Sequence, residues 1–521
     1  MRRWLYLGFV LIMVGCGQAP PANSNQAAFA NPTAEPTLIN LNALITWEPV
    51  PAYTPPVPTP TTLPLPPQPT PIADVWPNEQ ASALRPAFAS DANDPSMPRY
   101  AMQITLDPAA GSYSGSQVIS YTNTTGASIN SVVLRSYPNF PPDVQGDGGD
   151  TTLNVTKAWS NAGELTISRE AENSAFRINL ATALAPNQQV VINTSFAGTI
   201  KAWPDGSYPL LSAYPMLARW DVATNDWRMD VTRFPDRVLA ETALYLVELN
   251  LPVEYEVIGA GSVLRQSADR SVRTYVSGPV REWAAAIGEF SSSSTMIDEL
   301  EVTAFGPEYL DLERVREMAA GALSSYQAKF GAYPYRKLDL HVMPWDSRGG
   351  IEYPAYTIIL IDSVVNREID YVVFHEVAHQ WWYGILGNDI YREAWLDEAL
   401  ANYLTYVATQ DVLGQAAANS YYTGEIERLE HSNHANGNWP AGLAINEYPS
   451  FNSYYRAVYG KGAAMLHQLR IKLGDQAFFQ GLTQLNTQQR YQIISRSDFQ
   501  AAMEQSSGQA LGEWLDSWLD W

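Results

Sequence analysis

Cysteine is almost absent from this chain: its 521 residues include one, Cys16. A single cysteine excludes an intrachain disulfide and any metal site of the Cys-x-x-Cys kind. Basic residues are also scarce, because 32 Lys and Arg stand against 54 Asp and Glu and the formal net charge is −22. A charge of that sign excludes a surface field that attracts nucleic acid, so we predict no nucleic-acid partner.

Apolar residues are plentiful. They make up 46% of the chain, and its length allows two or three domains, each with its own core. Disorder throughout is therefore excluded. Since the only thiol lies near the N-terminus, a metal in the folded body must be held by Asp, Glu or the 6 histidines.

The N-terminus has the pattern of an export signal. Two arginines precede an apolar run over residues 4–14, which is too short to span a bilayer and ends at Gly15 and Cys16. This ending resembles the bacterial lipobox, in which the cysteine is lipidated and becomes the new N-terminus. We predict a lipoprotein signal peptide over residues 1–15 and an exported protein, anchored through a lipid on Cys16 to the outer face of the cell membrane. An ordinary secretory signal and an uncleaved anchor are the alternatives.

A proline-rich segment follows. Residues 19–77 contain 16 of the 36 prolines, and proline holds the backbone extended without donating hydrogen bonds. We predict that residues 16–95 comprise the lipidated cysteine and a semi-rigid tether. A proline-rich ligand for partner domains is the alternative.

Alternating apolar and polar residues then predict a β-rich N-terminal domain over residues 96–298. Short strands are expected at 100–106, 117–121, 131–134 and 189–196, with Gly, Asn, Pro and Asp between them. Strands of this length and spacing favour an antiparallel saddle or sandwich.

The apolar period changes near Glu308, and we predict a second, catalytic domain over residues 299–521. A helix is expected from Val315 to Gly331, followed by short strands at 338–343 and 357–361, and then mostly helices to Trp521. The predicted fold class is therefore α+β and multidomain.

One constellation carries metal chemistry. His375 and His379 are four residues apart in an apolar helical stretch, so their imidazoles lie on one face, one turn apart. Glu376 is placed to reach a water on the same ion. A second predicted helix offers Glu398, nineteen residues beyond His379. Two histidines, one carboxylate and an open fourth position are what catalytic zinc requires, so we predict one Zn²⁺ per chain.

The other histidines have simpler interpretations. His431 and His434 have helical spacing but lie in a polar stretch, so we expect them to be solvated. His341 lies in an apolar strand and His467 on a helix, where packing or surface exposure is expected.

Together with the zinc motif, two further segments resemble the aminopeptidase N-like family of gluzincin metallopeptidases. Gly349-Gly350-Ile351-Glu352-Tyr353-Pro354 is similar to the family's exopeptidase motif, and Tyr459-Gly460-Lys461-Gly462 is similar to the motif that carries its catalytic tyrosine. The resemblance covers residues 95–521. It implies an N-terminal saddle domain followed by a thermolysin-like, mainly helical peptidase domain.

The resemblance also implies roles. Glu376 would take a proton from the attacking water and return it to the leaving amine, and Tyr459 would hold the oxyanion. Glu352 would pair with the free α-amino group of a peptide, and the backbone at Gly349 and Gly350 could approach the substrate closely. The implied function is zinc-dependent hydrolysis of the N-terminal bond of peptides outside the cell, with no obligate protein partner evident.

Some features depart from the family. Tyr353 and Ile351 replace the usual Asn and Met, and Glu241 is only a candidate for the N-terminal residue that shares amine binding. The chain ends about where longer members begin a C-terminal domain, so we expect an open cleft. Two alternatives therefore stay open: an endopeptidase or a peptidase that needs no free amine, and an inactive lipoprotein that binds peptide or glycan.

Overall fold

The computed structural model describes residues 10–11, 79–141, 151–234, 237–345, 348–362 and 368–521. The described residues from Glu79 onward belong to one compact unit. Cys16 and the tether up to residue 78 lie outside the described residues, so the lipid anchor stays a prediction. Within the described part of the chain, no helix has the length and apolar character needed to cross a membrane.

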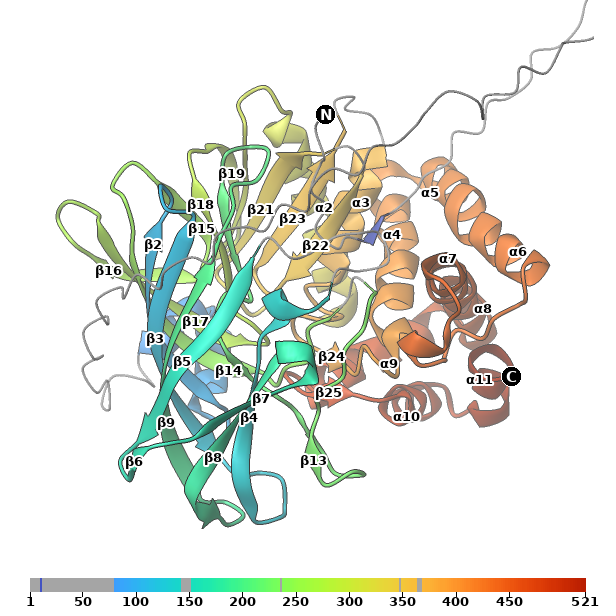
Figure 1. Cartoon of the computed structure of the whole chain (residues 1–521). Helices are drawn as coiled ribbons and strands as arrows, with labels where there is room; N and C mark the ends of the chain where they lie inside the picture. The colour runs from blue at the N-terminus through green and yellow to red at the C-terminus, as the bar shows by residue number, and fades with distance from the viewer. Residues whose placement is uncertain (1–9, 12–78, 142–150, 235–236, 346–347, 363–367) are drawn as a thin grey trace, which may run out of the picture. The chain divides into compact units, whose positions relative to one another are not determined.

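The first part of the chain is built from antiparallel strands (Figure 1). Its largest sheet has eight strands in the order β16-β17-β14-β2-β3-β9-β5-β6, with β14 and β2 parallel. In sequence order these are β2 Arg99–Asp107, β3 Ser112–Thr122, β5 Thr152–Ser160, β6 Gly163–Glu164, β9 Gln189–Thr199, β14 Ala243–Asn250, β16 Ser262–Gln266 and β17 Val272–Val280.

Smaller sheets complete this part. A four-stranded sheet contains β4 Ile129–Arg135, β7 Ile167–Glu170, β8 Ala175–Leu184 and β11 Met216–Leu217, and a three-stranded sheet contains β10 Tyr208–Leu211, β15 Glu256–Gly259 and β18 Ala284–Gly288. A short pair joins β12 Trp220–Asp221 to β13 Asp226–Trp227.

The expected strands are confirmed, and each extends a little beyond its apolar core. In β2 the side chains of Tyr100, Met102, Ile104 and Leu106 are buried, as the alternation predicts. The Tyr100 ring stacks on Tyr245 of β14 with centroids 4.9 Å apart. Cross-strand aromatic pairs of this kind stabilise a sheet, so the pairing of β2 with β14 is well supported.

A six-stranded sheet carries the exopeptidase-like segment. Its order is β1-β22-β23-β21-β20-β19, with β20, β21 and β23 parallel and β22 antiparallel to β23. The predicted domain boundary at 298/299 falls in the turn between two paired strands of this sheet, β19 and β20. The division of the chain into two domains there stays a prediction. The strands are β1 Val10–Leu11, β19 Ser291–Ile297, β20 Leu300–Gly306, β21 Lys337–Pro344, β22 Gly349–Tyr353 and β23 Tyr356–Ile361.

The rest of the chain is mainly helical, as predicted (Figure 1, orange to red). The helices are α2 Leu312–Phe330, α3 Glu368–Ala378, α4 Glu398–Leu413, α5 Gln415–Tyr421, α6 Arg428–Ala435, α7 Phe451–Tyr455, α8 Ala463–Leu473, α9 Asp475–Gln488, α10 Arg496–Ser507 and α11 Gly512–Leu519. Two π-helical turns, η6 Tyr422–Glu427 and η8 Arg456–Gly462, interrupt them. A short parallel pair, β24 Gly387–Asn388 with β25 Ile493–Ile494, links the two ends of this part.

Helix α2 fixes the two helices that carry the metal motif. Its N-terminus is capped by Asp311, whose side chain accepts a hydrogen bond from the Arg314 N–H, and it ends at Gly331, where φ is 97°. The Tyr326 hydroxyl donates to the carbonyl of Phe374 in α3 at 2.9 Å and lies 3.0 Å from the carbonyl of Leu404 in α4. One buried tyrosine therefore holds α2, α3 and α4 together.

Candidate metal centre

Helices α3 and α4 bring the three predicted ligands together. His375 lies in the last turn of α3 and His379 directly follows it, with its N–H donating to the His375 carbonyl at 3.2 Å. The Nε2 atoms of the two histidines are 2.9 Å apart, and Glu398 Oε2 lies 3.2 Å from the first and 3.4 Å from the second. All three side chains are buried. Glu398 opens α4, so the start of one helix faces the end of the other.

This arrangement fits zinc. Bonds of about 2.0–2.1 Å in a tetrahedron put neighbouring ligand atoms roughly 3.4 Å apart, close to the separations here. Among the described residues, nothing hydrogen-bonds to Glu398 Oε1, although it is buried. A buried carboxylate oxygen without a partner is costly unless a cation compensates it. The donor set of two imidazoles and one carboxylate is that of a catalytic zinc site with an open position.

Asp397 orients the second histidine. Its Oδ1 lies 2.6 Å from His379 Nδ1 and the carboxylate is buried. A proton on Nδ1 bonded to this carboxylate leaves Nε2 free for a metal, which is the usual support of a zinc histidine. The sequence prediction missed this residue, although its position beside Glu398 was a signal for it.

Glu376 faces strand β22. Burial raises the pKa of its carboxyl group to about 8, while a hydrogen bond from the Thr357 hydroxyl to Oε2, at 3.4 Å, favours the charged form. A methyl group on Gly350 would lie 2.2 Å from Glu376 Oε1, so only glycine lets the strand pass so close to this carboxylate. The close approach seen here is to the presumed base, and the predicted approach of this backbone to a substrate stays a prediction.

Glu352, on the same strand, reaches the centre. It is half-buried, and a carboxylate oxygen of Glu352, one of Glu376 and a ring nitrogen of His379 all lie within 4.8 Å of one another. Gln380 holds the strand in place, because its Nε2 donates to the Tyr353 carbonyl at 3.0 Å and its Oε1 accepts from the Ala355 N–H at 2.8 Å. The residue after the metal motif thus fixes the exopeptidase-like strand against the metal helix.

Tyr459 lies beside the ring of His375. Its ring is buried and stacks on the His375 ring, with centroids 6.1 Å apart and planes at 13°. The glycines of its motif let helices meet here: a methyl group on Gly462 would lie 2.7 Å from the Ala399 Cβ, and one on Gly460 2.5 Å from the Leu429 Cβ. The motif therefore presses this turn against the helix that begins with Glu398.

A further buried carboxylate, Glu282, was not predicted. It accepts hydrogen bonds from the Tyr383 hydroxyl and from the Ser212 hydroxyl at 3.0 Å, and burial raises its pKa to about 7. Burial raises the pKa of Tyr353 well above its usual range, and the charges of Glu282 and Glu352 add to that shift. The pKa of Tyr383 is raised for the same reasons. Two carboxylates, one from each part of the chain, therefore act on the same tyrosines.

Tyr383 also has an unusual backbone. Its φ of 145° is a conformation that favours glycine, and its carbonyl accepts a hydrogen bond from the buried Arg281 at 3.0 Å. Strained residues of this kind cluster at functional sites. Tyr383, the constrained residue, thus connects the Glu282 carboxylate to the segment that follows the metal helix α3.

Other candidates lie away from the centre. Glu241 forms an ion pair with Arg219 at 3.2 Å, and its side chain is 47% exposed. His431 is exposed, as expected. The indoles near the metal motif are core residues, since each is at most 1% exposed: Trp381, Trp382 and Trp395.

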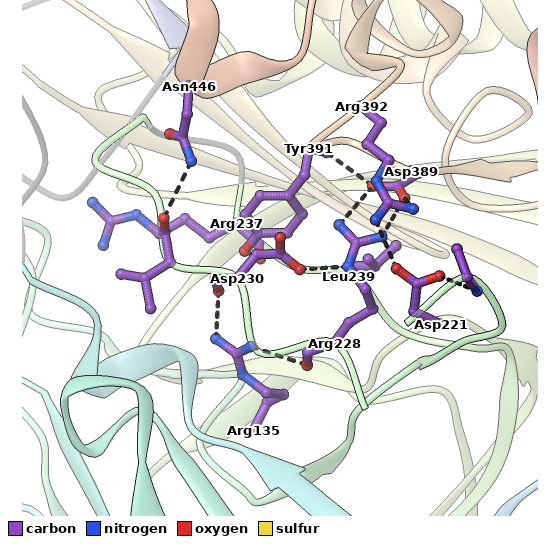
Figure 2. Close-up of polar contacts among 12 residues, drawn as sticks. Arg135, Asp221, Arg228, Asp230, Arg237, Leu239, Asp389, Tyr391, Arg392 and Asn446 are labelled. Atoms are coloured by element: carbon purple, nitrogen blue, oxygen red, sulfur yellow. Dashed lines mark hydrogen bonds and ion pairs between the residues drawn. The ribbon is translucent and has the colours of Figure 1, made fainter. Parts of the chain in front are cut away.

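The segment between the metal ligands is tied to the β-rich part of the chain, as Figure 2 shows. Arg228 donates to the Asp389 carboxylate at 2.5 Å, and both side chains are largely buried. Arg392 pairs with Asp221 at 2.7 Å. These contacts join the end of β12 and the residue after β13 to the nine residues before Glu398.

Comparison with known proteins agrees with this geometry. Residues 315–518 match the family model described as Peptidase family M1 domain. Aminopeptidase N of Streptomyces lividans is 24% identical over 226 residues, which are 41% of this chain and 26% of that protein. Aminopeptidase N of Lactococcus lactis subsp. lactis is 26% identical over 162 residues, which are 30% of this chain and 19% of that protein. The matches span about a quarter of the length of these relatives or less.

Solved structures share the fold. The M1 zinc metallopeptidase from Deinococcus radiodurans aligns over 82% of this chain and 93% of its own, with a TM-score of 0.57 and 16% identity. A mutant of that protein bound to a Tyr-Ser-Ala substrate aligns with a TM-score of 0.58 and 15% identity, over 82% of this chain and 94% of its own.

The fold and the ligand set therefore define a zinc metallopeptidase domain with an α+β architecture. Residues 315–518 are similar to the peptidase family M1 domain, and the curated relatives that match this part of the chain are named aminopeptidases.

Proposed function

We propose that this protein is a zinc aminopeptidase that removes the N-terminal residue of peptides. The observation that carries the proposal is the position of Glu352, whose carboxylate lies within 4.8 Å of Glu376 and His379. An α-ammonium group paired with Glu352 would present the first peptide bond, and no later one, to the metal centre.

His375, His379 and Glu398 would hold zinc, which would supply a Lewis acid to the scissile carbonyl and lower the pKa of a water molecule. Glu376 takes a proton from the attacking water and delivers it to the leaving amine. Its buried, high-pKa carboxyl group suits a residue that must hold a proton for part of the cycle. Closeness to Gly350 fixes the direction of that carboxyl group.

Tyr459, beside the His375 ring, supplies a hydrogen-bond donor. Its hydroxyl would stabilise the negative charge that develops on the carbonyl oxygen, in a buried setting where such a donor has most effect. Burial of the ring against His375 means that the donor needs no reorganisation during the reaction.

Glu352 favours a cationic substrate end, because its carboxylate would contact the ammonium directly. The protein from Deinococcus radiodurans was solved with a tripeptide, and the curated relatives are named aminopeptidases, which supports a peptide substrate here. We further propose that the protein acts outside the cell, tethered through Cys16.

Hydrolysis of aminoacyl-anilides tests the proposal. We expect activity that a chelator removes and zinc restores, and a loss of at least about a hundredfold in kcat for Glu376→Gln with the zinc content unchanged. Full activity of that variant would exclude Glu376 as the base. A purified protein without bound zinc would favour a binding lipoprotein.

A second candidate is a peptidase that does not need a free amine. This second function is favoured by Tyr353, which stands where the family has asparagine, and by Glu352, which is only half-buried. It predicts equal cleavage of free and N-acetylated peptides.

A further inference from the structure

Asn402 connects the helix of a zinc ligand to the presumed catalytic tyrosine. It lies on α4, one turn after Glu398, and its side chain is 1% exposed. Its Nδ2 donates to the main-chain carbonyl of Tyr459 at 2.7 Å. A side-chain amide thus bonds the backbone of the very residue whose hydroxyl is needed at the centre.

The orientation of this amide is fixed. The Tyr421 hydroxyl, also buried, donates to Asn402 Oδ1 at 2.5 Å. Since the Tyr459 carbonyl can only accept, the amide nitrogen must face Tyr459, and the amide oxygen then accepts from the Tyr421 hydroxyl. Both polar groups of the Asn402 side chain therefore have hydrogen-bond partners: Tyr421 at the end of α5 and Tyr459 in η8.

The carbonyl that Asn402 binds lies in a π-helical turn. Such turns are rare, cost stability and occur frequently at functional sites. Each residue rotates an α-helix by about 100°, so a return of η8 to α-helical hydrogen bonding would turn Tyr459 away from the histidines. A second contact supports the same turn: the Tyr455 ring lies 4.6 Å from the Tyr459 ring, and its hydroxyl donates to the buried Glu425 at 2.8 Å.

We propose that Asn402 is a positioning residue for Tyr459, which sets the tyrosine hydroxyl relative to Glu398 on the same helix. The claim about catalysis rests on the proposed function. Asn402 does not contact the substrate. It acts by holding the π-helical turn, so that the zinc ligand and the oxyanion donor keep a constant separation.

A double-mutant cycle tests the proposal. We expect Asn402→Ala to lower kcat by about tenfold to a hundredfold with little change in KM, since a displacement of the order of 1 Å has such effects. In a Tyr459→Phe background the same substitution should change kcat less than about twofold, because the hydroxyl it positions is gone. Tyr421→Phe, which removes only the partner of Oδ1, should give a smaller effect with the same dependence on Tyr459.

Asn486 offers a matched control. It is also buried, and its Nδ2 donates to the Phe330 carbonyl at 2.8 Å, away from η8. Asn486→Ala should reduce stability comparably, and any effect on kcat should be equal in both backgrounds. Equal losses of kcat for Asn402→Ala with and without the Tyr459 hydroxyl would overturn the proposal.

Hydrogen exchange gives a readout that does not depend on activity. Amides of residues 456–462 should exchange faster in Asn402→Ala and unchanged in Asn486→Ala, as measured by mass spectrometry. Unchanged exchange there would also overturn the proposal. Faster exchange in a protein that hydrolyses no peptide would contradict the proposed function while supporting the contact between Asn402 and η8.

Discussion

Individual side chains around the metal centre are held by neighbours that leave each with one useful orientation. His379 is the clearest case, because the Asp397 carboxylate takes its Nδ1 and leaves Nε2 facing Glu398. Gln380 fixes strand β22 in a similar way, because its side-chain amide donates a hydrogen bond to the Tyr353 carbonyl. At this scale the centre is prepared for a metal by hydrogen bonds to residues that are not ligands.

Removal of the charge on Asp397 should weaken zinc binding. We expect Asp397→Asn to lower zinc affinity about tenfold to a hundredfold, because the amide cannot hold the His379 tautomer as the carboxylate does. Competition with a chromogenic chelator measures the affinity. Asp339→Asn is the control, since Asp339 is similarly buried but pairs with Lys337. Equal affinity of Asp397→Asn and the wild type would contradict the assigned role.

Glu282 should make stability depend on pH. Its pKa is raised to about 7 in the folded protein, so the folded state holds a proton that the unfolded state has already lost above about pH 4.5. Stability is therefore lost as the pH rises from about 4.5 to 7, by on the order of 3 kcal/mol. Glu282→Gln removes this dependence.

Urea unfolding at pH 5 and pH 7.5 measures this effect. The free energy of unfolding of Glu282→Gln relative to the wild type should rise between the two pH values. A difference that does not change with pH would mean that the carboxyl group is not held protonated by burial.

The sequence predicted well those site residues that lie close together along the chain. His375, Glu376 and His379 could be predicted because helical periodicity alone places them, and Glu398 because a zinc site needs a further ligand. Glu282 and Asn402 could not be predicted, since their contacts join positions 101 and 57 residues apart. Such contacts depend on how strands and helices pack, which periodicity does not determine.

At the scale of elements, the packing of β22 against α3 matters most. The strand places Gly350 against the Glu376 carboxylate and Glu352 two residues further on. The sequence predicted β21, β23 and α2 nearly at their observed ends, because short apolar runs, helical spacing from Val315 and the stop at Gly331 mark them. It did not predict that β22 is a strand of the same sheet, since two glycines weaken any strand signal.

A methyl group at Gly350 should disturb this packing. We expect Gly350→Ala to lower kcat about a hundredfold, because its Cβ would overlap the Glu376 carboxylate and displace it. Gly424→Ala is the control, since no atom lies within 4 Å of a Cβ there. Steady-state kinetics and circular dichroism of both variants measure the effect. Wild-type kcat in Gly350→Ala would show that the strand can shift without cost.

At the scale of the whole molecule, the β-rich and helical parts share the site. Glu282 comes from the strand-rich part and contacts Tyr383, while Arg228, which follows β13, contacts the segment before Glu398 (Figure 2). The Arg228 and Asp389 side chains are 7% and 9% exposed. Their pair is therefore screened little by solvent, and it connects the two parts near the metal ligands.

Loss of Arg228 should be costly. We expect Arg228→Met to destabilise the protein by about 3 kcal/mol, because it removes the nearest partner of the buried Asp389 charge and leaves only Arg392, at 3.9 Å. Arg270→Met is the control, since the Arg270 and Glu256 side chains are 45% and 50% exposed, and its effect should stay within about 1 kcal/mol. Denaturant unfolding measures both. Equal effects would show that the buried pair has no special role.

The central claim is that a free N-terminal amine directs hydrolysis to the first peptide bond. The most direct measurement is mass spectrometry of a peptide library incubated with the zinc-loaded protein, with and without N-terminal acetylation. The account predicts loss of single N-terminal residues from the free peptides and no cleavage of their acetylated counterparts. Internal cleavage, or equal cleavage of both sets, would contradict it.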